Sequence, residues 1–253
     1  MNKPFYLSRT AIHYPCLSDT RSVSGISSLA INEIPPGAIS FPGPVVAGQR
    51  ELLSDELYYW LHLEKIPPAQ LALARQVHGA AVQYVDRPGV YPGIDGFFSD
   101  RRDLQLAIRT ADCAAVMISF PEAPAAGIAH AGWRGARENI VESLLREMLN
   151  CWPAAPGEIR VAIAPYIKKC CYAVGEEFSD FFPAETLQRR EGKLYFDLEK
   201  TIVEQLRQSG IAPRQITAAP FCTACASVPL HSFRKHKTAR RLLNIIAISG
   251  GDR

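Results

Sequence analysis

Long hydrophobic runs are missing from this 253-residue sequence. Nowhere do about 18 apolar residues follow one another, which is the length that a membrane-spanning helix needs. Residues 1–15 also lack the uninterrupted apolar segment of a secretory signal peptide. We therefore expect a cytoplasmic protein without a membrane partner.

A large excess of charge of one sign is also missing. The 28 basic and 25 acidic residues give a net charge of +3 at pH 7, whereas nucleic-acid-binding proteins concentrate a much larger basic excess on one face. Only residues 234–241 are locally basic, and such a run is usually a solvated or anion-binding surface. We expect no nucleic-acid partner.

Glycine-rich phosphate loops and a regular cysteine framework are absent too. The lack of G-x-G-x-x-G and Walker loops argues against the common nucleotide-binding α/β domains. Seven cysteines without regular spacing do not form a secreted disulfide framework, so we expect reduced thiols. Cys222 and Cys225 have C-x-x-C spacing, but a second zinc site would need further ligands from Cys170, Cys171 or His231. We favour buried thiols here.

The hydrophobic pattern predicts one α+β domain over residues 1–253. No repeat or linker divides the chain, and 47% hydrophobic residues suffice for a large core. Several connections between predicted strands are too short for a helical crossover, which favours mixed β-sheets flanked by helices. Strands are predicted at residues 5–12, 28–34, 71–77, 81–85, 104–108, 114–120, 125–129, 159–164, 216–221 and 242–248. Helices are predicted at 49–64, 140–148, 176–182 and 197–210, and turns or loops at 22–28, 35–48, 86–93 and 93–100.

Two histidines and one cysteine fall near the ends of predicted strands: His78, Cys113 and His130. Three such side chains can hold a catalytic zinc and leave a fourth position for water or substrate. Their long spacings are also compatible with ordinary core residues. A third interpretation is a Cys-His hydrolase with Cys113 as the nucleophile. In either functional scheme Asp112 or Asp95 can orient an imidazole.

The turn His130-Ala-Gly-Trp-Arg-Gly135 precedes a predicted helix. Backbone N–H groups at such a turn, together with Arg134, can hold a phosphate. Alternatively, the glycines only shape the turn and Trp133 is a core residue. The segment from His231 to Arg240 combines hydroxyls with cations, which suits either an anionic ligand or a solvated loop.

Taken together, these motifs resemble the YfiH family, also described as polyphenol-oxidase-like or laccase-domain proteins and as purine nucleoside phosphorylases. The resemblance extends over residues 71–248, in the order of the family. It rests on these segments: Gln76-Val-His-Gly79, Asp95-Gly96, Thr110-Ala-Asp-Cys113, His130-Ala-Gly-Trp-Arg-Gly135, Ala164-Pro165, Cys171-Tyr-Ala-Val-Gly175, Cys222-Thr223, Ser232-Phe-Arg234 and Thr238-Ala-Arg240.

The resemblance implies that His78, Cys113 and His130 bind one zinc ion. It also implies phosphorolysis of adenosine, inosine, guanosine and methylthioadenosine to the base and ribose 1-phosphate, and deamination of adenosine. Asp112 or Asp95 would transfer the proton, and Arg134, Arg234 and Arg240 are candidates for binding phosphate. The expected partners are therefore a purine nucleoside and phosphate, in a monomer or homodimer.

The chain departs from the family near both ends. Arg21-Ser-Val-Ser-Gly25, Ala30-Ile-Asn32 and the proline-rich segment 35–48 differ at the N-terminal side, and Phe233-Arg-Lys235 and Thr238-Ala-Arg240 at the C-terminal side. These segments would enclose the substrate, so substrate choice stays open. One alternative is an amidase that removes L-serine from UDP-N-acetylmuramate by zinc or Cys-His chemistry. Another is a non-enzymatic zinc-binding module with a closed fourth position. Copper oxidation of phenols is less expected, because one His/Cys site does not supply several copper centres.

Overall fold

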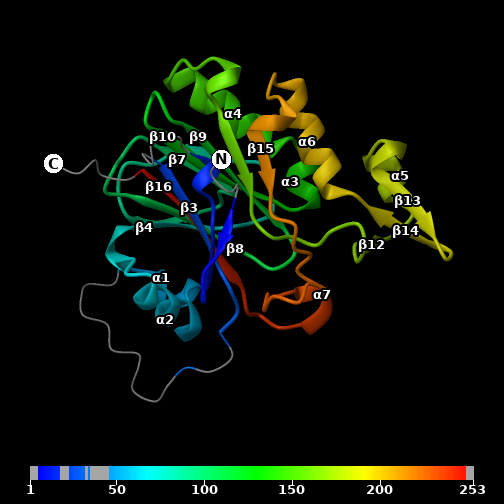
Figure 1. Ribbon diagram of the computed structural model, residues 1–253, viewed down its shortest axis with the longest axis horizontal. Coiled ribbons are helices and arrows are strands. Elements are labelled where there is room, and N and C mark those ends of the chain that lie inside the picture. Colours follow the sequence, from blue (N-terminus) through cyan, green and yellow to red (C-terminus); the bar gives the residue numbers. More distant parts are fainter. Residues whose placement is uncertain (1–4, 18–22, 32–33, 35–45, 249–253) are drawn as a thin grey trace.

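Two β-sheets lie face to face between two layers of helices in the computed structural model, which describes residues 5–17, 23–31, 34 and 46–248 (Figure 1). Within these residues the first sheet has seven strands, in the order β1 (Tyr6–Leu7), β2 (Ala11–His13), β3 (Val23–Ser28), β16 (Leu242–Ile248), β8 (Gln105–Thr110), β4 (Leu71–Arg75) and β6 (Gly89–Pro92). The second has six, in the order β15 (Ile216–Ala218), β11 (Arg160–Ile163), β9 (Ala114–Phe120), β10 (Ala125–Ala131), β7 (Gly96–Ser99) and β5 (Val82–Tyr84).

Helices cover the outer faces of both sheets (Figure 1). Helices α1 (Gln49–Leu52) and α2 (Asp55–Leu63) cover the seven-stranded sheet, and α3 (Trp133–Arg137), α4 (Ile140–Cys151) and α6 (Leu198–Gln208) cover the six-stranded sheet. A small sheet of β12 (Ala173–Val174), β14 (Lys193–Phe196) and β13 (Leu187–Arg190) projects beside them with α5 (Phe178–Phe181). Helix α7 (Phe233–His236) precedes β16, and short 3-10 turns lie at Pro15–Leu17, Pro68–Gln70, Pro156–Glu158, Ala184–Thr186 and Pro213–Gln215. The expected α+β class with mixed sheets and flanking helices is confirmed.

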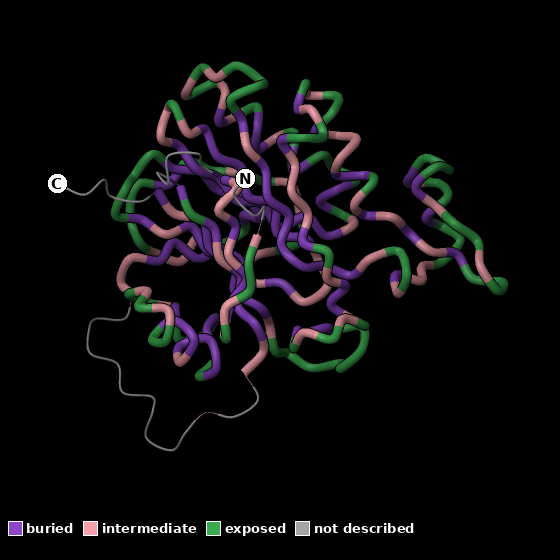
Figure 2. Tube along the Cα trace, in the orientation of Figure 1, coloured by how far each residue is buried: buried purple, intermediate pink, exposed green. Residues whose placement is uncertain are grey.

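The central strands are buried on both faces, which explains their continuous apolar sequences (Figure 2). In β9, Val116 and Ile118 pack against the helices, whereas Ala115 and Met117 pack against the other sheet. Successive side chains of a strand point to opposite faces, so a strand between two apolar layers needs apolar residues at every position. None of the described helices is long and apolar enough to cross a membrane.

Two predicted helices form as expected. The residues Ile140, Leu144, Leu145 and Met148 form the buried face of α4. Asp197 caps α6, because its carboxylate accepts a 3.0 Å hydrogen bond from the backbone N–H of Lys200. Beyond the last turn of α6, Gly210 has a φ of +86°, as expected for the residue that stops the helix.

Other predictions need correction. The helix predicted at 49–64 is two helices, because Leu53 is extended and the Ser54 hydroxyl accepts a hydrogen bond from Leu57 N–H to start α2. The segments 22–28, 86–93 and 93–100, predicted as turns or loops, contain strands β3, β6 and β7. Sheet pairing outweighs their content of small residues and prolines, since β3 pairs with β2 and β16. Of the strand predicted at 28–34, only Ser28 lies in a strand, as the last residue of β3, and the described residues 29–31 and 34 have no strand structure.

The chain crosses from the seven-stranded to the six-stranded sheet at the carboxyl ends of three parallel strands. Strands β8, β4 and β6 are adjacent and parallel, so their carboxyl ends lie at one edge of the seven-stranded sheet. After each of them the chain crosses to the six-stranded sheet, as β9, β5 and β7 respectively. Strand β10 is antiparallel to β7 and β9, so it ends where they begin. Four separate segments therefore meet at one seam between the sheets.

Candidate active site

The residues His78, Asp95, Cys113 and His130 all lie at this seam. His78 follows β4, Asp95 directly precedes β7, Cys113 directly precedes β9, and His130 is the penultimate residue of β10. The ligand-capable atoms of His78, Cys113 and His130 lie within 4.8 Å of one another. The structure thus brings together the three residues that the sequence analysis considered as metal ligands.

Asp95 positions two members of this group through hydrogen bonds. It is fully buried, and its carboxylate accepts hydrogen bonds of 2.9 to 3.0 Å from the backbone N–H groups of Val77, His78 and Gly79. Its Oδ1 also lies 2.7 Å from Nδ1 of His130. Burial by itself would raise the pKa of Asp95, but the hydrogen bonds from His130 and from the backbone lower it. One carboxylate therefore holds the His78 loop and orients the His130 ring.

Cys113 and His130 form a polarised pair. Burial alone would raise the pKa of Cys113, yet hydrogen bonds from His130 and His78 lower it to about 6. Burial alone would lower the pKa of His130, but its bonds to Asp95 and Cys113 raise it to about 9. A thiolate beside two imidazoles is a strong metal-binding set and also an activated nucleophile.

Two glycines of the His130–Gly135 turn are required by close approaches. A Cβ atom on Gly132 would lie 2.8 Å from Sγ of Cys113, and one on Gly135 would lie 3.0 Å from the carbonyl oxygen of Gly79. The contact at Gly132 is shorter than those that real Cβ atoms make, and the one at Gly135 would require the Gly79 backbone to shift. The motif thus lets α3 begin directly against the thiol and the His78 loop. His78 itself has a φ of +64°, a left-handed conformation that is uncommon for residues other than glycine.

A cavity of about 1100 Å³ opens over this group, which is large enough for a nucleoside-sized ligand. His78, Cys113 and His130 line it, together with Arg134 and Arg234. The Arg134 guanidinium lies 4.4 Å from the ring centre of Trp133, and that of Arg234 lies 5.5 Å from the ring centre of Tyr172. The cavity therefore combines a soft metal-binding set with cations and aromatic walls.

Arg240 lies elsewhere. It is not among the residues that line this cavity, but lines a smaller one of about 320 Å³ beside Ser54, Asp55 and Glu56. The three arginines considered from the sequence are thus divided between two places, with Arg134 and Arg234 beside the metal-binding set.

Asp112 faces the same cavity as the two arginines. Its carboxylate accepts 2.6 Å hydrogen bonds from the Thr223 hydroxyl and from the backbone N–H of Arg234. These contacts tie the segment before β9 to the segment after β15 and to α7. Asp95, in contrast, does not line the cavity.

Several lining residues were missed by sequence reasoning: Gln76, Arg109, Tyr172 and Arg241. The side chain of Gln76 donates to the carbonyl oxygen of Arg109 at 2.9 Å and accepts from its N–H at 3.0 Å, which joins the ends of β4 and β8. Gln76 and Tyr172 lie inside two motifs that carry the family resemblance, Gln76-Val-His-Gly79 and Cys171-Tyr-Ala-Val-Gly175, which were the available signal.

The donor set fits a metal ion. It offers two imidazoles and one thiol, and one imidazole is oriented by a buried carboxylate, as in many metal centres. His78 is exposed and His130 is buried, so the group is supported from inside and accessible from the cavity. Three protein ligands leave room for a substrate or water, as catalytic zinc sites do.

Comparisons with known proteins identify the family. Residues 46–249 match the family described as Multi-copper polyphenol oxidoreductase laccase. A purine nucleoside phosphorylase of Aquifex aeolicus is 36% identical over 61% of this chain and 70% of its own length, and the purine nucleoside phosphorylase YlmD of Geobacillus stearothermophilus is 32% identical over 71% and 73%. The adenosine deaminase RL5 of an unknown prokaryotic organism is 24% identical over 65% of this chain and 70% of its own length.

Solved structures show the same fold. The crystal structure of YlmD from Geobacillus stearothermophilus has a TM-score of 0.81 and 26% identity, covering 98% of this chain and all of its own. The Bacillus licheniformis YfiH structure has a TM-score of 0.80 at 22% identity, with the same coverage. The chain therefore belongs to the YfiH-type, laccase-domain family of multi-copper polyphenol oxidoreductase-like proteins.

Proposed function

We propose that this chain is a zinc-dependent purine nucleoside phosphorylase that also deaminates adenosine. The observation that carries the proposal is the group of His78, Cys113 and His130, backed by Asp95, at the base of a cavity lined by Arg134 and Arg234. The names of the relatives, purine nucleoside phosphorylase and adenosine deaminase, support the same substrate class.

Arg134 and Arg234 would bind the phosphate. A guanidinium stacked on an aromatic ring keeps its N–H edge available for anions, and both arginines have such a ring partner. Arg234 is further held by a 2.6 Å hydrogen bond to the carbonyl oxygen of Ala173. In phosphorolysis a phosphate oxygen forms a bond to the anomeric carbon while the bond from that carbon to the purine nitrogen breaks. The electron pair leaves with the base, which takes up a proton.

Asp112 is our candidate for transferring that proton, because it lines the cavity between the metal-binding group and Arg234. We assign Asp95 a positioning role instead, since its oxygens already accept hydrogen bonds from three backbone N–H groups and from His130. Trp133 and Tyr172 give the cavity aromatic walls, which suit a purine ring.

His78, Cys113 and His130 would hold the zinc ion. When bound there, zinc would supply a Lewis acid at neutral pH. The role of the protein in this scheme is to keep Cys113 deprotonated and His130 in one orientation, and Asp95 does the latter through Nδ1. We do not favour copper, because a single group of two histidines and one cysteine is smaller than the several copper centres of a multicopper oxidase.

The test is a paired assay on purified protein of known metal content. Adenosine is incubated with and without phosphate, and the products are separated by chromatography. We expect adenine only with phosphate and inosine without it. Cys113→Ala should lose both activities together with the zinc ion of this site. The same assay is repeated with inosine, guanosine and methylthioadenosine. Zinc-loaded protein that converts none of these four nucleosides would contradict the substrate assignment.

A second candidate function is favoured by the order Cys113, His130, Asp95. A thiol, an imidazole and a carboxylate in hydrogen-bonded sequence also form the nucleophile, base and orienting group of a Cys-type hydrolase. Such an enzyme could be the amidase that removes L-serine from UDP-N-acetylmuramate. Activity on that amide that survives a chelator but is abolished by iodoacetamide would identify this chemistry. Loss of activity on chelation, restored by zinc, would favour the metal enzyme.

A further inference from the structure

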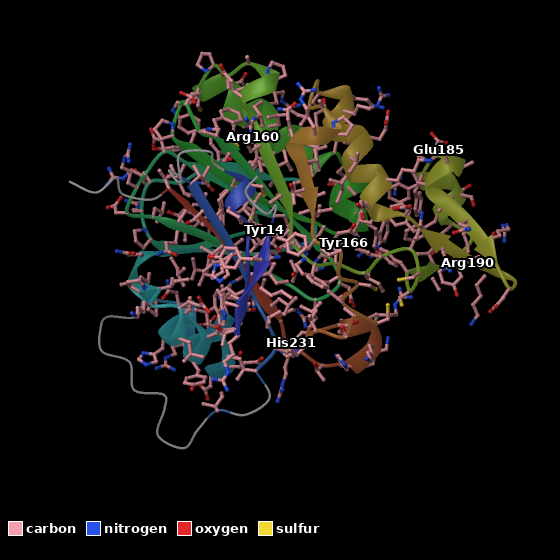
Figure 3. The ribbon with its side chains drawn as sticks, in the orientation of Figure 1. Tyr14, Arg160, Tyr166, Glu185, Arg190 and His231 are labelled. Carbon is pink, nitrogen blue, oxygen red and sulfur yellow. The ribbon has the colours of Figure 1, made fainter. Side chains whose placement is uncertain are left out.

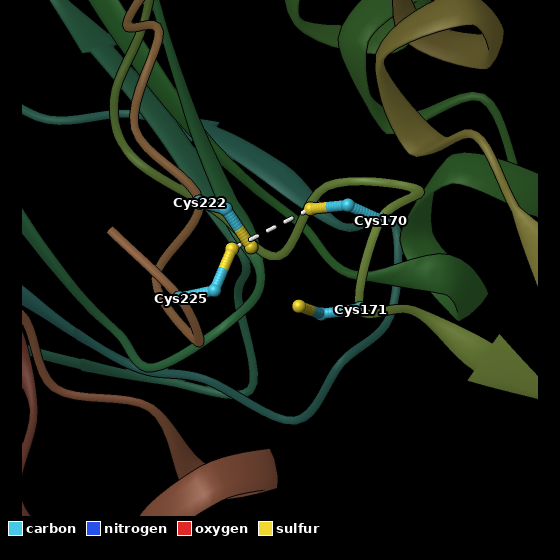
Figure 4. Close-up of side chains that lie close together, drawn as sticks. All are labelled: Cys170, Cys171, Cys222 and Cys225. Carbon is cyan, nitrogen blue, oxygen red and sulfur yellow. Dashed lines mark hydrogen bonds between the residues drawn. The ribbon is translucent and has the colours of Figure 1, made fainter. Parts of the chain in front are cut away.

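Four cysteines that the active site does not use lie together on the molecule. Cys170 and Cys171 stand in the segment between β11 and β12, and Cys222 and Cys225 in the segment after β15. Their sulfur atoms point toward one another and all lie within 4.8 Å of one another (Figure 4). None of the four lines the active-site cavity. We refer to these residues as the four-cysteine cluster.

This arrangement corrects an expectation from the sequence. Cys222 is buried, but Cys170 and Cys225 are exposed, so the pair of the C-x-x-C motif is not simply a pair of core thiols. His231, which was also considered as a ligand, instead lies with Nε2 2.7 Å from Oε1 of Glu56, outside the cluster (Figure 3).

The distance between two of the sulfurs distinguishes a disulfide bond from a shared metal ion. Sγ of Cys170 lies 3.7 Å from Sγ of Cys225, which is far longer than the roughly 2.05 Å of a disulfide bond. A tetrahedral zinc ion with Zn–S bonds of about 2.3 Å holds its ligand sulfurs roughly 3.8 Å apart. The separation of these two sulfurs, which is also that of a thiol–thiol hydrogen bond, fits two ligands on one ion.

Backbone hydrogen bonds join the two segments and shape the second one. The backbone N–H of Thr223 donates to the carbonyl oxygen of Tyr166 at 3.1 Å, which joins the second segment to the end of β11. The N–H groups of Cys225 and Ala226 donate to the carbonyl oxygen of Cys222 at 3.3 and 2.9 Å, forming the tight turn that brings the two thiols together. The four-cysteine cluster thus does not depend on its own sulfur contacts for its shape.

Polar groups beside the sulfurs suit negative charge. The backbone N–H of Lys168 donates to Sγ of Cys222 at 3.4 Å. Arg190, labelled in Figure 3, donates to the carbonyl oxygens of Lys169 at 2.7 Å and of Cys170 at 3.4 Å, which places a cation against the loop that carries the first two ligands. The backbone N–H that faces Cys222 stabilises its thiolate, which is the form that binds metal.

We propose that Cys170, Cys171, Cys222 and Cys225 bind a single zinc ion in a closed tetrathiolate site. Four protein ligands leave no position for substrate, so the role is structural. The ion would join the segments that follow β11 and β15. These segments also carry Tyr172, which lines the active-site cavity, and Thr223, which holds Asp112. The site would therefore stabilise one wall of that cavity without taking part in the reaction.

Zinc is favoured over a polynuclear iron–sulfur cluster by the compactness of the group. Such a cluster distributes its cysteine ligands over different irons and holds their sulfurs farther apart than ligands of one ion. Here every pair of sulfurs lies within 4.8 Å. Closed sites in which four cysteines bind one ion are the form of many structural zinc sites.

The test is the metal content of the full-length protein, measured by mass spectrometry of the elements after gel filtration. We expect two zinc ions per wild-type chain, and one in the double variant Cys170→Ser/Cys225→Ser. These two cysteines are exposed, so their exchange disturbs packing least. Cys113→Ala should also retain one, and Cys151→Ser, a matched exposed cysteine outside both groups, should retain two. Circular dichroism confirms that each variant is folded.

Cobalt substitution provides a readout that is independent of activity. In Cys113→Ala loaded with cobalt, the remaining ion should show the strong thiolate-to-metal absorption of four sulfur ligands. In the double variant the remaining ion should show the weaker band of one sulfur ligand. These counts separate the two sites, so failure of the nucleoside assay leaves this result interpretable.

Three outcomes would overturn the proposal. One is a wild-type zinc content no higher than that of the folded double variant. Another is a disulfide among the four cysteines in freshly purified protein. The third is iron with acid-labile sulfide in place of zinc.

Discussion

Asp95 Oδ1 lies 2.7 Å from Nδ1 of His130, and the same carboxylate accepts the backbone N–H of His78 at 2.9 Å. One buried side chain thus positions two candidate ligands that are far apart in the sequence. Removing its charge should affect the metal site before it affects anything else, because Asp95 lies directly behind that site.

Asp95→Asn should weaken zinc binding by about 10- to 100-fold, the usual cost of losing a carboxylate behind a ligand histidine. An amide also cannot accept from every N–H group that now faces the carboxylate. Competition with a chromophoric chelator measures the affinity, and Asp103→Asn, on an exposed surface carboxylate, is the control. Unchanged affinity in Asp95→Asn would contradict the positioning role.

Gly132→Ala should displace Cys113, because the new Cβ would lie 2.8 Å from its sulfur. The backbone of Gly132, with φ −76° and ψ 175°, is one that alanine adopts readily, so the effect would come from the contact alone. Zinc content and activity should both fall. The matched variant Gly157→Ala, where an added Cβ meets nothing within 4 Å, should match the wild type.

The reactivity of Cys113 should depend on pH in a characteristic way. In metal-free protein, the pKa of about 6 means that the thiolate predominates above that pH and is protonated below it. The alkylation rate of Cys113 by iodoacetamide, followed by peptide mass spectrometry, should therefore be half-maximal near pH 6. In protein unfolded by urea the midpoint should move to about 8.5. The same midpoint in native and unfolded protein would exclude the polarised pair.

The three candidate arginines should differ in their effect on the KM for phosphate, according to the cavity that each one lines. Arg134→Ala and Arg234→Ala should each raise the KM for phosphate about 10- to 100-fold, because a hydrogen bond to a charged group is worth roughly 1.5–3 kcal/mol. Arg240→Ala should change it little, since Arg240 lines the other cavity. Steady-state kinetics at saturating nucleoside provide the comparison, and an effect in Arg240→Ala alone would reverse the assignment.

The helix layer over the six-stranded sheet should be sensitive to truncation. Leu144 is fully buried on α4, so Leu144→Ala should lower the free energy of unfolding by about 2–5 kcal/mol. Arg146→Ala, on the exposed face of the same helix, should stay within about 0.5 kcal/mol of the wild type. Urea unfolding followed by circular dichroism measures both values.

The sequence predicted the central strands well, because strands buried on both faces need continuous apolar residues. Residues 114–120 are an example, and β9 has these bounds. It failed at β6 and β7, whose glycines and proline suggested loops, because pairing with neighbouring strands decides their structure. The position of α4 was predictable from the helical spacing of its apolar residues. The division between α1 and α2 depends instead on the cap formed by Ser54.

For the site, the sequence indicated that His78 and Cys113 stand near strand ends, but not that those strands are parallel neighbours. That fact comes from β8, β4 and β6 lying side by side, and it is what brings the residues together. For the four-cysteine cluster the sequence supplied the candidates, because Cys170 and Cys171 were considered beside Cys222 and Cys225. Their proximity could not be predicted, since it depends on tertiary structure alone. The predictions that involve Arg21, Asn32 and residues 35–45 lie outside the described residues.

The geometry of the active site depends on the alignment of the two sheets, because its residues lie where the chain crosses between them. His78, Asp95 and Cys113 each sit on a covalent link from one sheet to the other, and His130 comes from the second sheet alone. If the two sheets docked one step out of alignment, the imidazoles and the thiol would no longer share a centre. An ion at that centre would bind only the correctly assembled chain. By mass action it would shift the folding equilibrium toward that state.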